Sequence, residues 1–109
     1  MLDNEARRDL MLIKQIADQV WGANCRFGDL KVMDSPYPEF EIPLRLYEKW
    51  DIGIYYDRSA VDIGIKQGEK YVLLDKFTTQ KVFRGMNAMT EDNLLHNFEL
   101  LNEVVLACS

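Results

Sequence analysis

The chain has 109 residues, 48% of them hydrophobic, and its 18 acidic and 13 basic side chains give a net charge of −5. This length and apolar content predict one folded domain over residues 1–109 and exclude a disordered chain. An acidic protein gains little from phosphate contacts, so nucleic-acid binding is disfavoured, and its charge favours a basic protein as partner.

No stretch of the sequence is apolar enough to act as a membrane or targeting segment. The longest unbroken apolar run, residues 104–108, has five residues, whereas a membrane helix needs about 20. The first eight residues are rich in charge and lack the apolar core of a signal peptide. Two cysteines are too few for a disulfide framework. We therefore expect a cytoplasmic protein with no membrane contact and with Cys25 and Cys108 reduced.

Residues 4–21 are predicted to form a helix, because apolar residues recur there at spacings of three and four. The apolar positions on its inner face are Ala6, Leu10, Ile13, Ala17 and Val20. Asp3 or Asn4 can cap the start of this helix, and Gly22 suits the position just after its end.

Two strands are expected next in the chain. The first is short, lies within residues 27–33 and runs through Leu30 and Val32. The second follows a loop that contains two prolines, and its apolar residues alternate with mostly polar ones. These apolar residues are Phe40, Ile42, Leu44 and Leu46. Within this second strand Pro43 has no N–H to donate, which predicts a strand at the sheet edge or a bulge.

The tetrapeptide Asp-Ile-Gly-Ile occurs twice, beginning at Asp51 and at Asp62, and predicts a hairpin around a turn at residues 57–60. Pairing Tyr56 with Val61 sets the isoleucines of both strands on one buried face. The other pairs are then Ile54 with Ile63, Ile52 with Ile65, Tyr55 with Asp62 and Gly53 with Gly64. On the opposite face, this register predicts a bare patch at the two glycines, beside a tyrosine.

The rest of the chain completes a sheet and adds a second helix. A turn at residues 66–69 predicts a third strand at residues 71–74, and residues 82–83 are a candidate for a fourth or fifth strand. The last helix is expected to begin after Thr90. Its predicted core stripe is Leu94, Phe98, Leu101, Val105 and Cys108. The pattern predicts a two-layer α+β domain: an antiparallel meander of about four to five strands with both helices on one face.

No group of residues matches a known catalytic or metal-binding pattern. His96 is the only histidine and is expected on the surface, without the further ligands that a metal site needs. Nothing in the sequence brings Cys25 next to it, and the paired carboxylates of the strands are interpreted as solvated. We therefore predict no catalytic residue, no metal, no cofactor and no enzymatic activity.

The open face of the predicted sheet is the candidate binding surface. Residues 34–63 carry seven acids against three bases, and tyrosines lie among the carboxylates. Such a face is typical of an interface with a basic protein, although ordinary solvated sheet faces are also common. The predicted partner-contacting residues are Tyr37, Glu39, Glu41, Tyr47, Tyr55, Asp57 and Asp62.

The segment from Trp50 to Arg58, a tryptophan followed by an alternating strand and an Asp-Arg turn, is similar to stretches in some small acidic bacterial immunity proteins. These proteins neutralise the toxin domains of contact-dependent and related polymorphic systems. The resemblance implies tight binding to a basic toxin domain, often a nuclease, whose active site or substrate path is blocked. A monomer is favoured over a dimer.

The alternative is a small acidic chaperone of the type III secretion kind. Such chaperones combine two terminal helices with a twisted antiparallel sheet and hold an extended segment of an effector as homodimers. This chain departs from that pattern, because no clear second helix lies between its strands.

Overall fold

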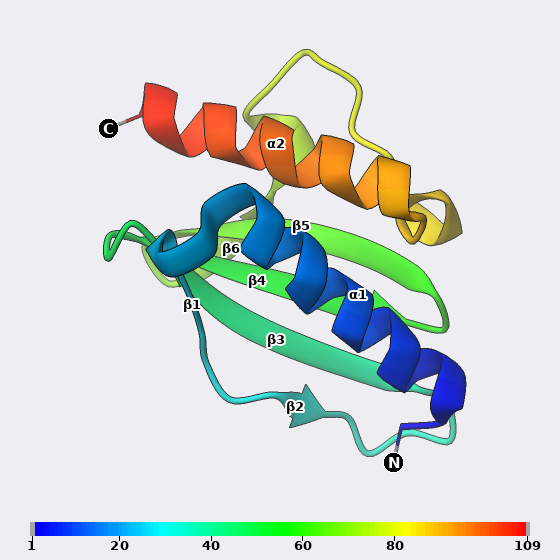
Figure 1. Cartoon of the computed structure of the whole chain (residues 1–109). Helices are drawn as coiled ribbons and strands as arrows, with labels where there is room; N and C mark the ends of the chain where they lie inside the picture. Colours follow the sequence, from blue (N-terminus) through cyan, green and yellow to red (C-terminus); the bar gives the residue numbers. More distant parts are fainter. Residues whose placement is uncertain (1, 109) are drawn as a thin grey trace.

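An antiparallel sheet with two helices over one of its faces makes up the fold, seen in a computed structural model that describes residues 2–108 (Figure 1). The helices and strands are α1 (Asn4–Trp21), β1 (Cys25–Phe27), β2 (Lys31–Val32), β3 (Glu39–Leu46), β4 (Trp50–Asp57), β5 (Ala60–Gln67), β6 (Lys70–Leu73) and α2 (Glu91–Ala107). The strand order is β1-β3-β4-β5-β6, and β2 also pairs with β3. The α+β fold class predicted from the sequence is confirmed.

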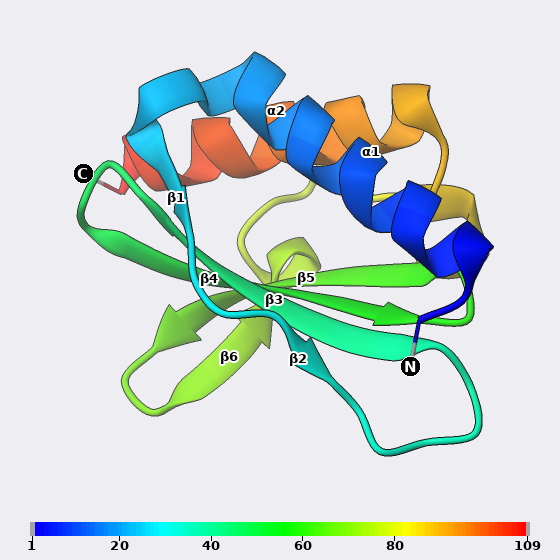
Figure 2. The same cartoon turned by 60° about the horizontal axis from the view of Figure 1, so that its bottom comes forward.

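Both helices begin at the caps that the sequence predicts. The side chain of Asp3 accepts a hydrogen bond of 2.8 Å from the amide of Ala6 at the start of α1. The side chain of Thr90 accepts one of 3.2 Å from the amide of Asn93 at the start of α2. The two helices pack side by side on the same face of the sheet, and no α-helix formed by residues 2–108 covers the other face (Figure 2). None of the helices within residues 2–108 has the length and apolar character needed to cross a membrane.

The central hairpin has the predicted register. β4 and β5 pair Tyr56 with Val61, and every other predicted pair follows from that one. β3 extends the same alternation, because Ile42 lies opposite Ile54, which in turn lies opposite Ile63. Each of the three strands therefore turns one set of alternate residues, which are large and apolar, to the helices and the other set to the open face.

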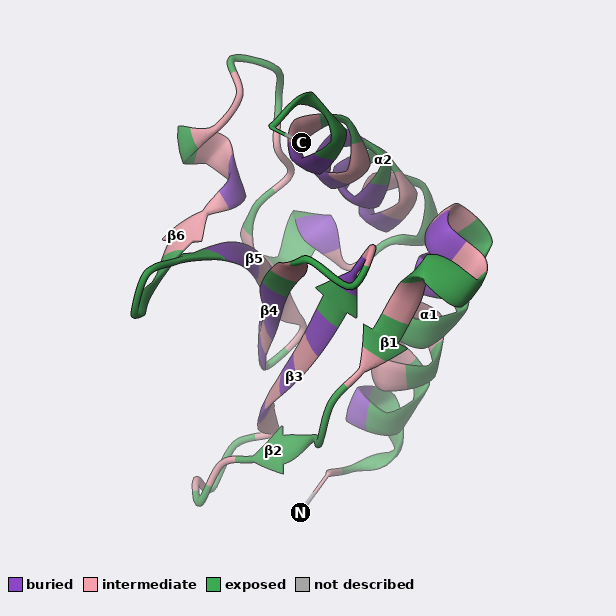
Figure 3. Ribbon diagram, turned by 90° about the vertical axis from the view of Figure 1, so that its left-hand side faces the viewer, coloured by how far each residue is buried: buried purple, intermediate pink, exposed green. Residues whose placement is uncertain are grey.

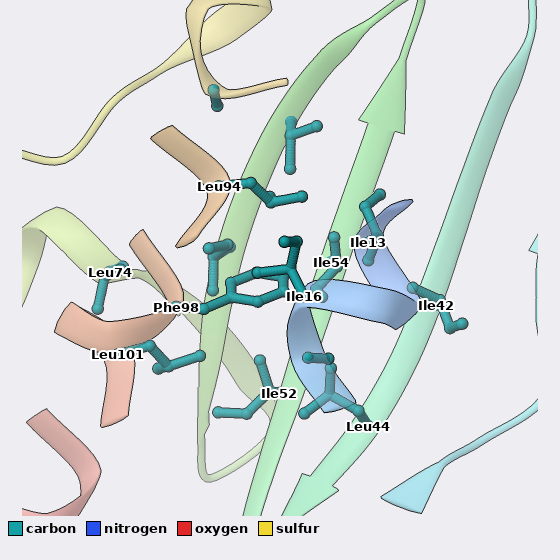
Figure 4. Close-up of a cluster of buried hydrophobic side chains, with 14 of the residues drawn as sticks. Ile13, Ile16, Ile42, Leu44, Ile52, Ile54, Leu74, Leu94, Phe98 and Leu101 are labelled. Carbon is teal, nitrogen blue, oxygen red and sulfur yellow. The ribbon is translucent and has the colours of Figure 1, made fainter. Parts of the chain in front are cut away.

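The core fills the space between the helices and the sheet. Phe98 of α2 is fully buried, and in the close-up its ring lies among side chains of α1 and of the central strands, with Ile16 and Ile54 nearby (Figure 4). Leu44 of β3 and Leu94 of α2 belong to the same cluster. Burying such side chains is the main source of the stability of a domain of this size.

Three local predictions were wrong. The strand expected at residues 27–33 is split into β1 and β2, and Val32 is 44% exposed because β2 lies at the edge of the sheet, paired only with β3 (Figure 3). Residues 82–83 form no strand, since their backbone binds to α2 instead of to the sheet. Cys108 is exposed rather than part of the core, because α2 ends at Ala107, one residue before it.

Pro43 does not lie in an edge strand, but the segment that joins β1 to β2 bulges opposite it: Phe27 pairs with Leu44 and Lys31 with Glu41, so residues 28–30 face only Ile42 and Pro43. Pro43 is in β3, which pairs with β4 on one side and with β1 and β2 on the other. The carbonyl of Pro43 accepts a 2.8 Å hydrogen bond from the amide of Gly28, in the gap between β1 and β2. In a strand the nitrogen and the carbonyl of one residue point to the same side. The nitrogen of Pro43 therefore points into the gap between β1 and β2, where no ladder hydrogen bond from it is needed.

Candidate protein-binding face

The register of the sheet arranges the open face in rows that run across the strands. One row contains Glu39 and Asp57, and the next contains Lys31, Glu41, Tyr55 and Asp62. A middle row follows, formed by Pro43, Gly53, Gly64 and Leu73. The last row contains Arg26, Arg45, Asp51, Lys66 and Tyr71. Acids therefore predominate at one end of the face, where Lys31 is the only base of the first two rows, and bases predominate at the other, where Asp51 is the only acid of the last row.

The acidic end, defined as Glu39, Glu41, Asp57 and Asp62, brings together four of the predicted partner-contacting residues. Glu39 lies directly opposite Asp57, and Tyr55 lies between Glu41 and Asp62. Burial, followed by the nearby charge of Glu41 and by Tyr71, raises the pKa of Tyr55 above its usual value. The sheet backbone fixes the relative positions of these four residues, because all of them belong to β3, β4 or β5.

Tyr37 stands beside the acidic end and is 52% exposed. The guanidinium of Arg58 lies 4.6 Å from the centre of its ring, a distance typical of a cation–π contact. Arg58 also forms a 2.9 Å salt bridge to Asp57, and its amide donates to the carbonyl of Pro38 at 3.0 Å. These contacts connect the loop before β3 to the β4–β5 turn. We refer to Tyr37 and Arg58 as the Tyr37–Arg58 corner.

The predicted bare patch at Gly53 and Gly64 is covered by two tyrosine rings. A Cβ placed on Gly53 would lie 3.1 Å from Tyr55 Oη and 3.2 Å from Tyr71 Cε1. A Cβ placed on Gly64 would lie 3.1 Å from Tyr71 Cβ. The two rings meet edge to face, with centroids 6.0 Å apart. The glycines therefore provide a flat floor for the protein's own tyrosines, and no bare surface is left for a partner.

Tyr47 is not on the open face, although the alternation of β3 predicted it there. β3 ends at Leu46, and Tyr47 adopts a positive φ of 56° in the following turn, so the alternation stops. Its hydroxyl donates to Asn102 Oδ1 of α2 at 2.6 Å. The same oxygen accepts a 3.0 Å hydrogen bond from Nε1 of Trp21. Tyr47 therefore connects the β3–β4 turn to α2.

The basic end of the open face was not anticipated from the sequence. A hollow of about 370 Å³ lies there, and its walls include Arg26, Arg45, Lys66, Asp51 and Tyr71. Arg26 forms an ion pair with Glu48, and Arg45 lies 3.8 Å from Asp51. The ammonium group of Lys66 forms no salt bridge with any of residues 2–108. Extending the hairpin register through the turn at Gly68 pairs Lys66 with Tyr71 and would have located both residues.

The other candidate groups offer no catalytic arrangement. His96 is exposed, and its Nε2 lies 2.7 Å from the carbonyl oxygen of Lys81. Burial, together with the charge of Asp18, raises the pKa of the Cys25 thiol to about 11, which disfavours the reactive thiolate. No group of three or more metal-ligating side chains occurs within residues 2–108. The open face is therefore the site with the clearest organisation of charge.

Comparison with protein families, with characterised proteins and with solved structures finds no match to this chain. The functional argument therefore depends on the geometry of the open face.

Proposed function

We propose that the chain is a protein inhibitor of the immunity kind, whose acidic end docks on a basic toxin domain in the cytoplasm. Binding would block the toxin's active site or the path of its substrate. The observation that carries the proposal is the gathering of four carboxylates beside the exposed Tyr37–Arg58 corner. Surface charges speed the encounter with an oppositely charged protein, while aromatic and arginine side chains slow its dissociation.

The backbone of the β4–β5 turn supports this proposal. Arg58 and Ser59 have positive φ values of 48° and 71°, which are unfavourable for residues other than glycine. The turn is held by the contacts of Arg58 and by a 3.1 Å hydrogen bond from Ser59 to Glu5 of α1. A two-residue hairpin turn commonly requires a positive φ at both of its central residues, so this conformation follows from the short connection between β4 and β5. The turn, held by these contacts, places the guanidinium of Arg58 over Tyr37.

Affinity capture with matched charge variants tests the proposal. The bait proteins are the unaltered chain, a Glu39→Lys/Asp57→Lys variant, and a Glu69→Lys/Glu99→Lys control with the same change in net charge. Glu69 and Glu99 are exposed and lie outside the acidic end. We expect a basic protein that the unaltered chain and the control retain and that the acidic-end variant loses. Retention by all three baits would refute docking at the acidic end.

The captured protein must also behave as a toxin. Its expression in a bacterial host should arrest growth, and co-expression of the unaltered chain should restore growth. Co-expression of the Glu39→Lys/Asp57→Lys variant should restore growth poorly, provided that circular dichroism shows an unchanged fold. A captured protein that leaves growth unaffected would contradict the inhibitor function while leaving the binding surface established.

Binding kinetics would separate the two parts of this surface. Tyr37 is largely exposed, whereas Tyr55 is already packed over Gly53. Tyr37→Ala should therefore speed dissociation more than Tyr55→Ala, with a loss of roughly 2 kcal/mol, about 30-fold in Kd, expected for a residue of this kind. Glu39→Lys should mainly slow association and flatten its dependence on salt, as measured by surface plasmon resonance.

A further inference from the structure

The charged and polar groups on one half of the open face are complementary to those on the other half. In its middle row, Pro43 belongs to β3, Gly53 to β4 and Gly64 to β5. On each of these strands, the open-face residues that flank the middle row form a matched pair of opposite or hydrogen-bonding groups. The pairs are Glu41 and Arg45 on β3, Tyr55 and Asp51 on β4, and Asp62 and Lys66 on β5.

A single two-fold axis would bring all three pairs together between two copies of the chain. The axis lies along the middle row, across the strands, so each strand faces its own copy in the opposite direction. Asp62 of each copy then faces Lys66 of the other, and Glu41 faces Arg45 in the same way. The hydroxyl of Tyr55 faces the carboxylate of Asp51. Each contact occurs twice, as an interface with two-fold symmetry requires.

We propose that the chain forms a weak, salt-sensitive homodimer through this open face. The groups that would pair are available in the single chain. Among residues 2–108, the side chains of Glu41, Asp62 and Lys66 form no salt bridge, and the Tyr55 hydroxyl forms no hydrogen bond. Arg45 and Asp51 are about half exposed and are separated by 3.8 Å, so their mutual contact is weak.

The edges of the face are compatible with this pairing. Lys31 pairs with Glu41, and Arg26 pairs with Arg45, so the axis would set Lys31 of one copy against Arg26 of the other. The charge of Arg26 is already balanced by its ion pair with Glu48. The hollow of about 370 Å³ at the basic end leaves room for the Glu41 side chain of the second copy.

The size of the face predicts a dimer that dissociates readily. Three strands of eight residues, rising about 3.3 Å per residue and spaced about 4.8 Å apart, make a face of roughly 26 by 15 Å. This is smaller than the roughly 800 Å² per partner of a standard stable interface. Glu39 and Asp57 lie one row beyond the paired rows, beside the Tyr37–Arg58 corner. The dimer would therefore compete with the proposed toxin only for Glu41, Tyr55 and Asp62.

Sedimentation velocity of the purified chain tests the dimer without any other partner. The protein is measured over a range of concentrations at about 0.01 M and about 1 M salt, which changes the Debye length from about 30 Å to about 3 Å. We expect a dimer fraction that increases with concentration and decreases at high salt. A chain that stays monomeric at its highest concentration in low salt would overturn the proposal.

Charge exchange identifies the face that associates. Asp62→Lys sets two lysines against each other twice in a homodimer, and Lys66→Asp does the same with two aspartates. Each variant alone should dimerise about tenfold or more weakly, because facing like charges are unfavourable. An equimolar mixture of the two variants should regain association, since every lysine then faces an aspartate. The double variant Asp62→Lys/Lys66→Asp should also dimerise like the unaltered chain.

Matched controls keep this test decisive. Glu69→Lys and Lys70→Asp make the same changes in charge outside the paired rows, at two exposed residues, one in the β5–β6 turn and one at the start of β6. Both should dimerise like the unaltered chain. A second exchange, Glu41→Arg with Arg45→Glu, covers the case in which one β5 variant fails to fold. A dimer that withstands both single variants, or a mixture that fails to regain association, would show that the open face is not the interface.

Discussion

Asn97 of α2 binds both polar groups of the Phe83 backbone. The amide of Phe83 donates to Asn97 Oδ1 at 3.0 Å, and Asn97 Nδ2 donates to the carbonyl of Phe83 at 3.0 Å. Asn97 is only 1% exposed. This one buried side chain makes the two hydrogen bonds that a neighbouring strand would otherwise make to Phe83. This contact explains why the residues around Phe83 remain extended without joining the sheet.

Asn97→Ala should be strongly destabilising. The substitution leaves the amide and the carbonyl of Phe83 without partners, and each unpaired buried group costs about 1–3 kcal/mol. We expect a loss of roughly 2–4 kcal/mol in the free energy of unfolding, measured by denaturant titration. His96→Gln is the neighbouring control: it can still donate to the carbonyl of Lys81, and it should change the stability by less than about 0.5 kcal/mol. Equal effects of the two substitutions would show that the Asn97 contact is unimportant.

Ile54→Ala tests the register of the sheet. Ile54 is fully buried between Ile42 and Ile63, and its truncation leaves a cavity that the neighbouring strands cannot close. The expected loss is about 2–4 kcal/mol in a denaturant titration. Val32→Ala, at a residue that is 44% exposed, should cost much less. An Ile54→Ala loss below about half a kcal/mol would indicate an exposed side chain and a wrong register.

Gly53→Val tests the floor beneath the tyrosine rings. Its side chain would overlap Tyr55 Oη and Tyr71 Cε1, which lie only 3.1 and 3.2 Å from the position of a Cβ. Such overpacking usually costs about 1–3 kcal/mol. The cost should be smaller in a Tyr71→Ala background, because one of the two rings is then absent. Additive effects in this double-mutant cycle would mean that Tyr71 does not lie over Gly53.

The raised pKa of Tyr56 predicts that the free energy of unfolding decreases in alkaline solution. Burial and its 2.5 Å hydrogen bond to Asp9 raise the pKa of Tyr56 to about 12 from the usual 10. The unfolded chain therefore loses this proton at lower pH than the folded chain, and the stabilisation present below pH 10 is lost as the pH rises to about 12. The difference in unfolding free energy between the unaltered chain and Tyr56→Phe should decrease over this interval. A difference that stays constant would contradict the raised pKa.

Much of the sheet could be predicted because its pattern is local. Ile52, Ile54 and Tyr56 alternate with polar or small residues, and so do Val61, Ile63 and Ile65. Only one register buries both sets on the same face, since a shift by one residue would turn them to water. The positions of Glu41, Tyr55 and Asp62 on the open face follow from the same alternation.

The side chains that depart from this alternation could not be placed from the sequence. Tyr47 lies on the helix side because a left-handed turn ends β3 and because Asn102 of α2 accepts its hydroxyl proton. Residues around Phe83 resemble a strand, but Asn97 provides their hydrogen bonds. In each case the deciding group is distant along the chain, and local propensity carries no information about it.

The sequence by itself determined the two helices, the central hairpin and the acid-rich character of the segment around it, because each depends on periodicity or composition within a short window. Only the tertiary structure decided that Tyr55 and Tyr71 cover Gly53 and Gly64, and that Arg26, Arg45 and Lys66 gather at one end of the open face. Those arrangements need strands from different parts of the chain to lie side by side. Strand pairing therefore brings acidic residues together at one end of the open face and basic residues together at the other, although the chain as a whole is acidic.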